Sequence, residues 1–348
     1  MMFARVRSFF VSRRLRVDSA GPMRTLWHNA PCGMSCQNVR MHALVADPAA
    51  LGGCRLSDVP TPRPSASETL VKVAFASVNP TDLHRAQHAP PGSVLGYEGA
   101  GTIERAAADG SGPPVGARVT GLGSSGTWAE FTSMPTSQLA VIPAGVDVEG
   151  AATLPIAGVS ALRALRALGP VLGRRLLVTG ATGAVGAFAV QLAAAAGVSE
   201  VIATARNPAA FPRLRELGAS TVVDSLTAEL GPVHGVVDNV GGPTLAQAFR
   251  LTAANATVVS VGRASGEDTV LASEDLMGDW GRSGRAIRTF FLPEEGAELG
   301  DDIGFLLRLA NEGRLHPRVN HREDLPGELT LLRGGEWPGK LVLRLHTP

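Results

Sequence analysis

The stretch Val178-Thr-Gly-Ala-Thr-Gly-Ala-Val-Gly-Ala187 decides the fold. It follows an apolar run and leads into an alanine-rich helical pattern from Phe188 to Ala196. A strand, a glycine turn and a helix in this order bind the pyrophosphate of a dinucleotide, because free N–H groups at the helix start face the negative charge. Gly180 permits the sharp turn, Gly183 lets the phosphates approach the backbone, and Gly186 lets the helix pack closely on the strand.

A glycine pattern alone is weak evidence, because many strand-to-helix turns carry glycines for packing. Here the flanking sequence repeats the alternation of strand and helix. The sequence predicts strands over residues 200–204, 221–224, 235–240 and 256–261, with a helix over residues 211–217. Repeated βαβ units of this kind predict a Rossmann-type, doubly wound parallel sheet.

Composition limits the function classes. A chain of 348 residues is long enough for two domains, and its net charge of +1 gives no reason to expect nucleic acid or an acidic surface as partner. The three cysteines, Cys32, Cys36 and Cys54, cannot form a disulfide framework in so long a chain, which favours a cytoplasmic protein. No apolar run approaches the length needed to span a bilayer, so no membrane partner is expected.

The first forty residues differ from the rest, with Asp18 as their only acid among many arginines. Ser12-Arg13-Arg14 resembles an export signal, but no apolar segment follows it; an organellar transit peptide is the other targeting alternative. Met41-His-Ala-Leu-Val looks like a native start. We therefore expect residues 1–40 to be a poorly ordered, non-native extension in which Cys32 and Cys36 form no metal site.

The sequence after Met41 has two regions with different secondary-structure patterns. Up to about residue 146 it reads as short strands with Gly and Pro between them, predicted over residues 69–74, 99–104, 117–120 and 139–142, which is typical of a barrel-like all-β unit. A helix over residues 159–168 then precedes the βαβ series. A helix over residues 301–311 and a strand over 341–345 follow it. The acidic, glycine-rich run 266–279 reads as a loop over the site or a solvated connection.

From Met41 to the C-terminus the chain resembles the medium-chain dehydrogenase/reductases, specifically their zinc-free quinone oxidoreductase branch. The motifs that carry the resemblance are Val78-Asn-Pro-Thr-Asp82, Leu95-Gly-Tyr-Glu-Gly-Ala-Gly101, Val115-Gly-Ala-Arg-Val-Thr120, Ala152-Thr-Leu-Pro-Ile-Ala-Gly158, Ala181-Thr-Gly-Ala-Val-Gly186, Val237-Asp-Asn-Val-Gly-Gly242 and Gly339-Lys-Leu-Val-Leu343. It implies an α/β protein with a GroES-like β-rich catalytic domain (41–147 and 289–348) and an inserted Rossmann NADP-binding domain (148–288). Ligands would bind between the two.

Zinc separates the branches of this family. Its zinc alcohol dehydrogenases place a Cys before the Thr-Asp pair and a His-Glu pair after the glycine, where this chain has Asn79-Pro80 and Tyr97-Glu98. Tetrahedral zinc needs ligands that an Asn and a Tyr are not expected to supply. The four-cysteine structural zinc lobe is also impossible, because Cys54 is the only cysteine of the catalytic domain. No metal is expected.

The short-chain dehydrogenases are a second family with a Gly-Ala-Thr-Gly-x-x-Gly turn. They carry it at the chain start and need a Tyr with a Lys four residues on. Tyr97 is the only tyrosine of this chain, and Gly101 stands at the position of that lysine. The residues therefore exclude this family.

The end of the second Rossmann strand predicts the cofactor. An NAD-preferring turn has an acid about 20 residues beyond the glycines, and here Arg206 stands 20 positions after Gly186. A guanidinium suits the 2′-phosphate of NADPH, and Thr204 could add a hydroxyl donor. The alternative is that Arg206 is a solvated surface charge. Ser225 replaces a Tyr that family members often have near this phosphate.

The resemblance implies the remaining cofactor contacts. Asn79 would lie near the nicotinamide, and Lys340 would approach the cofactor or close the cleft. For each contact, packing or helix capping is the alternative, and Ser160 near a helix start is a credible cap. The other implied contacts are Ser160, Thr182, Gly183, Ala184, Val185, Asn239, Gly262, Arg263 and Phe290.

Without zinc, the cleft suits transfer of hydride from NADPH to a quinone or to the β-carbon of an enone or enal, by positioning and by stabilisation of the developing enolate. The candidate catalytic residues are Asn79, His84 and Tyr97. His84 is a candidate proton donor, with water as the alternative. Tyr97 would border the substrate pocket or be a buried structural residue.

A different class stays open: an NADPH-binding, non-catalytic protein with a structural or RNA-binding role. The near-neutral charge and the absence of a basic stripe argue against RNA. We expect an enzyme that acts on a small-molecule substrate. We also expect this enzyme to form a homodimer.

Overall fold

Five strands of a six-stranded sheet form from the apolar runs that the sequence predicts as strands, and the sixth, Ala286–Thr289, was not predicted. All neighbouring strands of this sheet are parallel. The order reverses between β8 and β11, which is the position where doubly wound sheets bind nucleotides. The Rossmann-type sheet is therefore confirmed. Its order is β10-β9-β8-β11-β12-β13, with bounds Thr221–Val223, Glu200–Thr204, Arg175–Val178, Val233–Asp238, Thr252–Ser260 and Ala286–Thr289.

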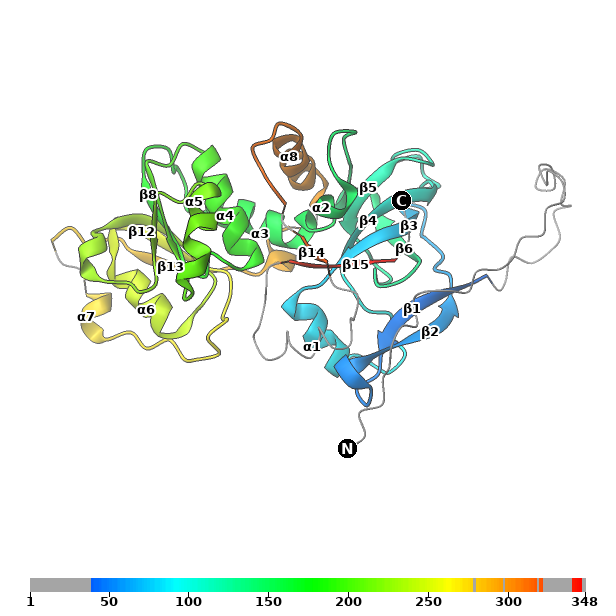
Figure 1. Cartoon of the computed structure of the whole chain (residues 1–348), viewed down its shortest axis with the longest axis horizontal. Helices are drawn as coiled ribbons and strands as arrows, with labels where there is room; N and C mark the ends of the chain where they lie inside the picture. The colour runs from blue at the N-terminus through cyan, green and yellow to red at the C-terminus, as the bar shows by residue number, and fades with distance from the viewer. Residues whose placement is uncertain (1–38, 278–279, 297, 318, 322–339, 346–348) are drawn as a thin grey trace, which may run out of the picture. The chain divides into compact units, whose positions relative to one another are not determined.

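Helices cover both faces of this sheet. Successive residues of a strand point to opposite faces, so Leu176 and Val178 of β8 join one apolar core and Leu177 joins another. The first core includes residues of α3 and α4, and the second includes residues of α6 (Figure 1). The helices around the sheet are α3 (Val159–Ala167), α4 (Ala184–Ala195), α5 (Phe211–Glu216) and α6 (Gly242–Arg250).

A second sheet builds the β-rich part, as predicted. Its order is β14-β15-β3-β4-β5-β7, and β6 also pairs with β3. β15 pairs antiparallel with β3, with Val342 opposite Ser77, so a strand near residue 340 completes a sheet that begins near residue 68 (Figure 1). The strands are β14 (Asn320–His321), β15 (Leu341–Arg344), β3 (Glu68–Ser77), β4 (Glu98–Arg105), β5 (Arg118–Leu122), β7 (Leu139–Val141) and β6 (Phe131–Pro135), with β1 (Arg40–Ala46) and β2 (Cys54–Pro60) as a separate pair.

The remaining elements are short, apart from two helices. These are α1 (Pro80–His88) and α8 (Gly300–Asn311). A π-helical turn, η3 (Leu154–Gly158), runs directly into α3. The others are η1 (Leu51–Gly53), η2 (Thr136–Gln138), α2 (Val148–Ala151), η4 (Pro208–Ala210), η5 (Ala228–Leu230), α7 (Ser273–Leu276) and η6 (Leu292–Glu294).

The computed structural model describes residues 39–277, 280–296, 298–317, 319–321 and 340–345. The predicted extension lies outside these ranges, except for its last two residues. No helix of the described residues is long and apolar enough to cross a membrane. The predicted domain limits, at residues 147/148 and 288/289, stay a prediction.

Most predicted elements have ends shifted by one or more residues, and the fifth Rossmann strand begins at Thr252 rather than at residue 256. Two other differences have a visible cause. The fourth Rossmann strand covers Val233–Asp238 rather than 235–240, because the side chain of Asp238 accepts the N–H of Gly241 and turns the chain there. The loop predicted over 266–279 contains the short helix α7. The carboxylate of Asp275 accepts the N–H of Ala272 and pairs with Arg250 at 2.8 Å, which fixes that turn.

Candidate active site

The glycine turn after β8 leaves an exposed helix start at the reversal of strand order. Gly180 has a φ of 59°, in the left-handed region that favours glycine. Gly183 precedes the first residue of α4, and no side chain caps this helix start within the described residues. A Cβ placed on Gly183 would meet only the carbonyl oxygen of Gly180, at 3.3 Å. The free N–H groups and the open space in front of them fit the pyrophosphate of a dinucleotide.

The turn is tied to the strands on either side of β8. The N–H of Gly180 donates to Thr204 Oγ1 at 3.1 Å, and Ala181 N–H donates to the carbonyl of the same residue at 3.0 Å. On the other side, Asn239 Nδ2 donates to the carbonyl of Thr179 at 2.9 Å. The carboxyl ends of β9, β8 and β11 are therefore held in one fixed arrangement.

Asp238 is a buried carboxylate that the sequence reading missed. Its Oδ1 accepts from Thr179 Oγ1 at 2.5 Å, and its Oδ2 accepts from the N–H of Gly241 at 2.9 Å. Burial raises the pKa of Asp238, and the bonds from Thr179, Gly241 and Val240 oppose that shift. The carboxylate thus ties the loop after β8 to the loop after β11, at the reversal of strand order. An acid at the end of an apolar strand was the available signal.

Arg206 and Thr204, both predicted to bind a 2′-phosphate, have different environments. Arg206 lies two residues after the end of β9, is exposed, and has no side-chain hydrogen bond or ion pair within the described residues. Thr204 is buried, and its hydroxyl accepts the N–H of Gly180. This bond holds the glycine turn and uses the hydroxyl oxygen as an acceptor, so the predicted donation from Thr204 to the phosphate stays a prediction.

The other predicted cofactor residues gather at the same edge, with two exceptions. Thr182, Ala184 and Val185 lie at the start of α4, while Asn239, Gly262 and the exposed Arg263 lie just after β11 and β12. A Cβ on Gly262 would meet the carbonyl oxygen of Asn239 at 2.7 Å, so those two loops touch. Ser160 is a buried residue within α3, whose N-cap is Gly158, so the capping alternative is wrong. Phe290 lies in the apolar core after β13.

A second cluster surrounds Glu98 on β4. This carboxylate is fully buried and accepts hydrogen bonds from four donors. Oε1 accepts from Ser77 Oγ, from Asn79 Nδ2 at 2.8 Å and from Lys340 Nζ at 2.8 Å. Oε2 accepts the N–H of Ile156 at 2.7 Å, in the π-helical turn η3. Glu98 therefore links β3, the start of α1, the residue before β15 and the turn that leads into α3.

Asn79 and Lys340 are 261 positions apart in the chain, and their side chains meet in this cluster. Lys340 Nζ donates to Asn79 Oδ1 and to Glu98 Oε1, and Lys340 is only 4% exposed. The prediction gave Lys340 a contact with the cofactor or the closing of a cleft. The structure places its ammonium in a buried ion pair, where it supplies the counter-charge of the Glu98 carboxylate, and the predicted role stays a prediction.

Asp82 completes the cluster and was also missed. It is the third residue of α1, where its Oδ2 accepts the N–H of Asn79 at 2.7 Å in a capping box. Its Oδ1 is buried and has no hydrogen-bond partner among the described residues. Burial raises the pKa of Asp82 to about 7. The Asn79 N–H and Lys340 lower it, while Glu98 raises it further. The Asn-Pro-x-Asp spacing of a capping box was the signal in the sequence.

The free energy of unfolding should depend on pH through Asp82. Its folded pKa of about 7 lies above its ordinary value of 3.8, so the folded state holds a proton that the unfolded state releases between these values. Stability should therefore fall as pH rises from about 4 to 7, by up to about 1.4 kcal/mol per pH unit, and then level off. Urea unfolding across this range should show the slope in the wild type and in Asp301→Asn, an exposed acid in the first turn of α8, but not in Asp82→Asn.

His84 and Tyr97 lie on the outer side of this cluster. His84 is exposed on α1 and stacks on His88, with ring centroids 4.1 Å apart. Tyr97 is half-buried beside Glu98 in the sequence, and the guanidinium of Arg85 lies 5.2 Å from its ring centroid. Neither side chain joins the hydrogen bonds of the buried cluster.

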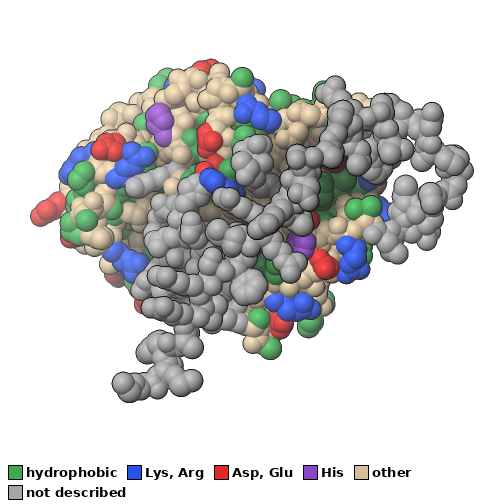
Figure 2. Space-filling model, turned by 45° about the vertical axis from the view of Figure 1, so that its right-hand side comes forward, with side chains coloured by type: hydrophobic (Ala, Val, Ile, Leu, Met, Phe, Trp, Pro, Cys, Tyr) green, Lys and Arg blue, Asp and Glu red, His purple; other side chains and the backbone are tan. Residues whose placement is uncertain are grey.

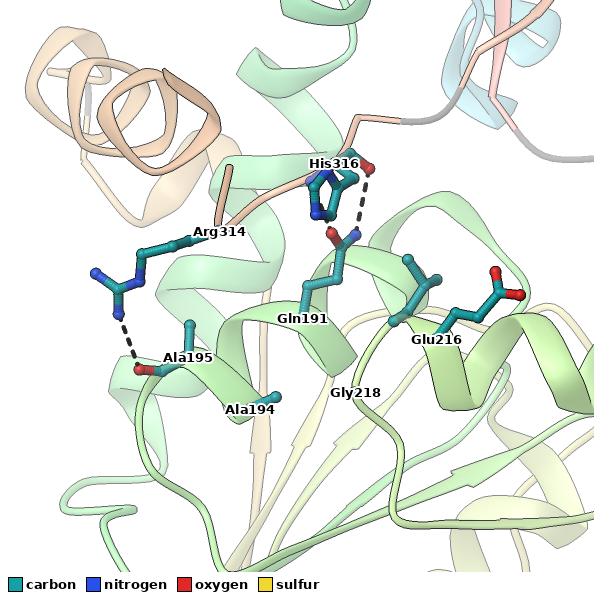
Figure 3. A pocket seen from close by; sticks show the side chains of 8 residues that line it. Gln191, Ala194, Ala195, Glu216, Gly218, Arg314 and His316 are labelled. Carbon is teal, nitrogen blue, oxygen red and sulfur yellow. Dashed lines mark hydrogen bonds between the residues drawn. The ribbon is translucent and has the colours of Figure 1, made fainter. Parts of the chain in front are cut away.

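A cavity beside α4 lies away from these residues. This cavity of about 260 Å³ runs along the second half of α4, far along the helix from the glycine turn at its start (Figure 3). Gln191 Oε1 accepts the N–H of His316 at 2.7 Å, and Arg314 donates to the carbonyl of Ala195 at 3.3 Å. These bonds anchor the segment after α8 on α4. No residue predicted to bind the cofactor lines this cavity.

The described ranges contain no group of three or more His, Cys, Asp or Glu side chains placed to hold a metal ion. At the positions of the zinc ligands in the metal-dependent branch, the amide of Asn79 is bonded to Glu98 and Lys340, and Tyr97 contacts Arg85. The zinc-free assignment stays a prediction.

Comparisons with known proteins agree with this architecture. Residues 65–144 match the alcohol dehydrogenase GroES-like domain, and residues 184–298 match the zinc-binding dehydrogenase family. Acryloyl-coenzyme A reductase of Sulfurisphaera tokodaii is 28% identical over 64% of this chain and 77% of that protein. A trans-enoyl reductase of Aspergillus japonicus, himH, is 35% identical over 51% of this chain, and the match spans 59% of that protein.

Two solved structures extend the likeness over most of the chain. The quinone oxidoreductase from Coxiella burnetii superposes with a TM-score of 0.73 at 25% identity, over 88% of this chain and 100% of that chain. A cobalt- and zinc-bound thermostable alcohol dehydrogenase from Pyrobaculum aerophilum gives 0.75 at 25% identity, over 88% and 100%. The chain belongs to the medium-chain dehydrogenase/reductases, in their quinone-oxidoreductase-like branch. Membership implies a nicotinamide cofactor and oxidoreductase chemistry.

Proposed function

We propose that the protein is an NADPH-dependent oxidoreductase that reduces a quinone or the activated C=C bond of an enone or enal without zinc. The observation that carries this proposal is the open start of α4 behind Gly183, at the reversal of strand order. Relatives named as an acryloyl-coenzyme A reductase and a trans-enoyl reductase, and a neighbour named as a quinone oxidoreductase, support the acceptor class.

The chain's own residues would bind and orient the reactants. When bound, the nicotinamide supplies the hydride. The N–H groups at the start of α4 would hold the pyrophosphate, and Asn79 would fix the nicotinamide end from its buried network. Solvent reaches His84, so this imidazole and water are both available as the proton source. Turnover by His84→Phe, measured beside its NADPH affinity, separates the two.

NADPH rather than NADH is proposed because Arg206 is exposed and free to pair at the end of β9. Arg206→Glu should weaken NADPH binding by about 1.5–3 kcal/mol and leave NADH binding nearly unchanged, because charge-assisted bonds to the 2′-phosphate are lost. Titration calorimetry with both cofactors measures this. Arg174→Glu is the matched control, because Arg174 is exposed at the opposite end of the strands, just before β8.

Asp224 is the residue that would bind the ribose if the protein preferred NADH. It follows β10, the strand beside β9, and its carboxylate accepts from Ser225 at 2.9 Å. If the protein instead prefers NADH and loses that preference in Asp224→Asn, the ribose contact belongs to Asp224 and the NADPH proposal is wrong.

Zinc independence and turnover are tested together. We expect NADPH to be oxidised with at least one member of a panel of quinones, enones and enals, at a rate that EDTA or 1,10-phenanthroline leaves unchanged. Elemental analysis should give well below one zinc per chain. Stoichiometric zinc with chelator-sensitive turnover would move the protein to the metal-dependent branch.

A non-catalytic, NADPH-binding role is the alternative from another class. It predicts cofactor binding without turnover of any acceptor in that panel. For an RNA-binding role, a basic surface would be needed; on the face seen in Figure 2, basic and acidic side chains are interspersed.

The homodimer also stays a proposal. Among the described residues, β13 pairs only with β12, and all four of its side chains are exposed. An edge strand of this kind can pair with a second copy. Light scattering after gel filtration measures the state directly.

A further inference from the structure

We propose that Asp82 and Glu98 are positioning residues that share the amide of Asn79, and that ionisation of Asp82 draws this amide out of place and lowers turnover. The inference rests on the proposed function, in which Asn79 lies beside the nicotinamide. It gives Asp82 and Glu98 a role in positioning Asn79, and neither acid donates a proton to the substrate.

The amide of Asn79 is divided between two carboxylates. Its Nδ2 donates to Glu98 Oε1 at 2.8 Å and to Asp82 Oδ2 at 3.3 Å, so the bond to Glu98 is the shorter. Its Oδ1 accepts from Lys340. Asp82 Oδ2 also accepts the backbone N–H of Asn79 at 2.7 Å. The orientation of the amide therefore depends on how strongly each carboxylate attracts its N–H groups.

The charges of the cluster do not balance if both acids are ionised. Asp82 and Glu98 are fully buried, and Lys340, at 4% exposed, supplies one positive charge. An uncompensated charge in the interior is costly, so one carboxyl should hold a proton. Glu98 accepts from four donors, one of them the ammonium of Lys340, whereas Oδ1 of Asp82 has no partner among the described residues. The proton therefore belongs on Asp82.

The charged groups that act on Asp82 are few. Lys340 and Glu98 affect its pKa, which burial raises to about 7. Other titratable side chains on α1 and on β1, which packs against it, point elsewhere: His84, His88, Arg40 and His42 are exposed, and Arg85 lies over Tyr97. A change of pH between 6 and 8 thus acts on the cluster through Asp82.

Ionised Asp82 is the stronger acceptor and should compete with Glu98 for Nδ2 of Asn79. The amide then turns toward α1 and away from the orientation that Glu98 and Lys340 hold. Because a group with a pKa of about 7 is about nine-tenths protonated at pH 6 and one-tenth at pH 8, turnover should fall about tenfold over this range.

The test uses the full chain, NADPH and 9,10-phenanthrenequinone as acceptor, from pH 6 to 8. We expect kcat to fall about tenfold in the wild type and in the control Asp301→Asn, with a smaller change in KM for NADPH. In Asp82→Asn, whose side chain cannot ionise, kcat should be independent of pH; wild type and variant are compared in the His84→Phe background, which removes the other candidate proton source. A pH-dependent fall that persists in Asp82→Asn, or a wild-type profile without the fall, overturns the proposal.

A second measurement needs no cofactor or turnover. Infrared difference spectra of the apoprotein between pH 6 and 8 should contain the band of a protonated carboxyl, and Asp82→Asn should lack it. A band retained in that variant, or missing in the wild type, overturns the proton assignment. If NADPH fails to bind at any pH, the proposed function falls and the positioning role falls with it, while the infrared band still decides where the proton lies.

Discussion

Gly183→Val is expected to abolish NADPH binding while the protein stays folded. Gly183 has φ −71° and ψ 166°, an extended conformation that any residue adopts, and a Cβ there would approach only the carbonyl oxygen of Gly180. The valine methyl groups would fill the space in front of the first N–H groups of α4. Loss of two charge-assisted bonds to the pyrophosphate weakens binding roughly 100-fold or more.

Gly186→Ala is the matched comparison within the same turn. A Cβ at Gly186 would collide with the carbonyl oxygen of Gly180 and lie 2.7 Å from Ala181 Cα, so the helix must move off the strand. We expect this variant to lose about 1–3 kcal/mol of folding stability. Circular dichroism and urea unfolding measure stability, and fluorescence titration measures binding. If folded Gly183→Val binds NADPH like the wild type, the turn is not the phosphate site.

Lys340→Met is expected to cause the largest loss of stability, about 3–5 kcal/mol. The substitution removes the counter-charge of Glu98, whose carboxylate is fully buried and cannot reach water. The double variant Glu98→Gln/Lys340→Met should recover most of this loss, because neither charge then remains in the interior. Urea unfolding of the single and double variants at pH 7.5 measures the difference.

An exposed ion pair gives the control for this prediction. Arg213 and Glu216 on α5 lie 2.8 Å apart but are 36% and 63% exposed. Arg213→Met should therefore change stability by at most about 1 kcal/mol. Equal losses in Arg213→Met and Lys340→Met would show that burial of the Glu98 pair has no special effect.

The sequence predicted the parallel sheet well because its evidence is local. Each of the five predicted strands contains an apolar run, and Gly180, Gly183 and Gly186 come within eight residues of the end of β8, whereas β13, with four exposed side chains, was not predicted. The position of the exposed Arg206 was also predicted from local evidence, because it follows from the number of residues between Gly186 and the end of β9. These features need no knowledge of distant contacts.

The buried cluster could not be predicted in the same way. Lys340 meets Asn79 across 261 positions, and Glu98 meets Ile156 across 58. Neither motif shows which residue it will contact. Lys340 was therefore expected to approach the cofactor or close the cleft, and Glu98 was noted only as part of the pair that replaces the His-Glu of the zinc enzymes. The bond from Gly180 to Thr204 was missed for a related reason: it depends on how β8 and β9 pair.

The pairing of β15 with β3 has a consequence for synthesis of the chain. A ribosome makes Ser77 and Glu98 long before Lys340 and Val342, and the entire Rossmann sheet emerges in between. The parallel sheet can therefore fold while the nascent β-rich half still lacks both an inner strand and the cation that neutralises its buried acid. Chains released early would carry one finished half and one that cannot close, which makes them natural targets for chaperones and proteases.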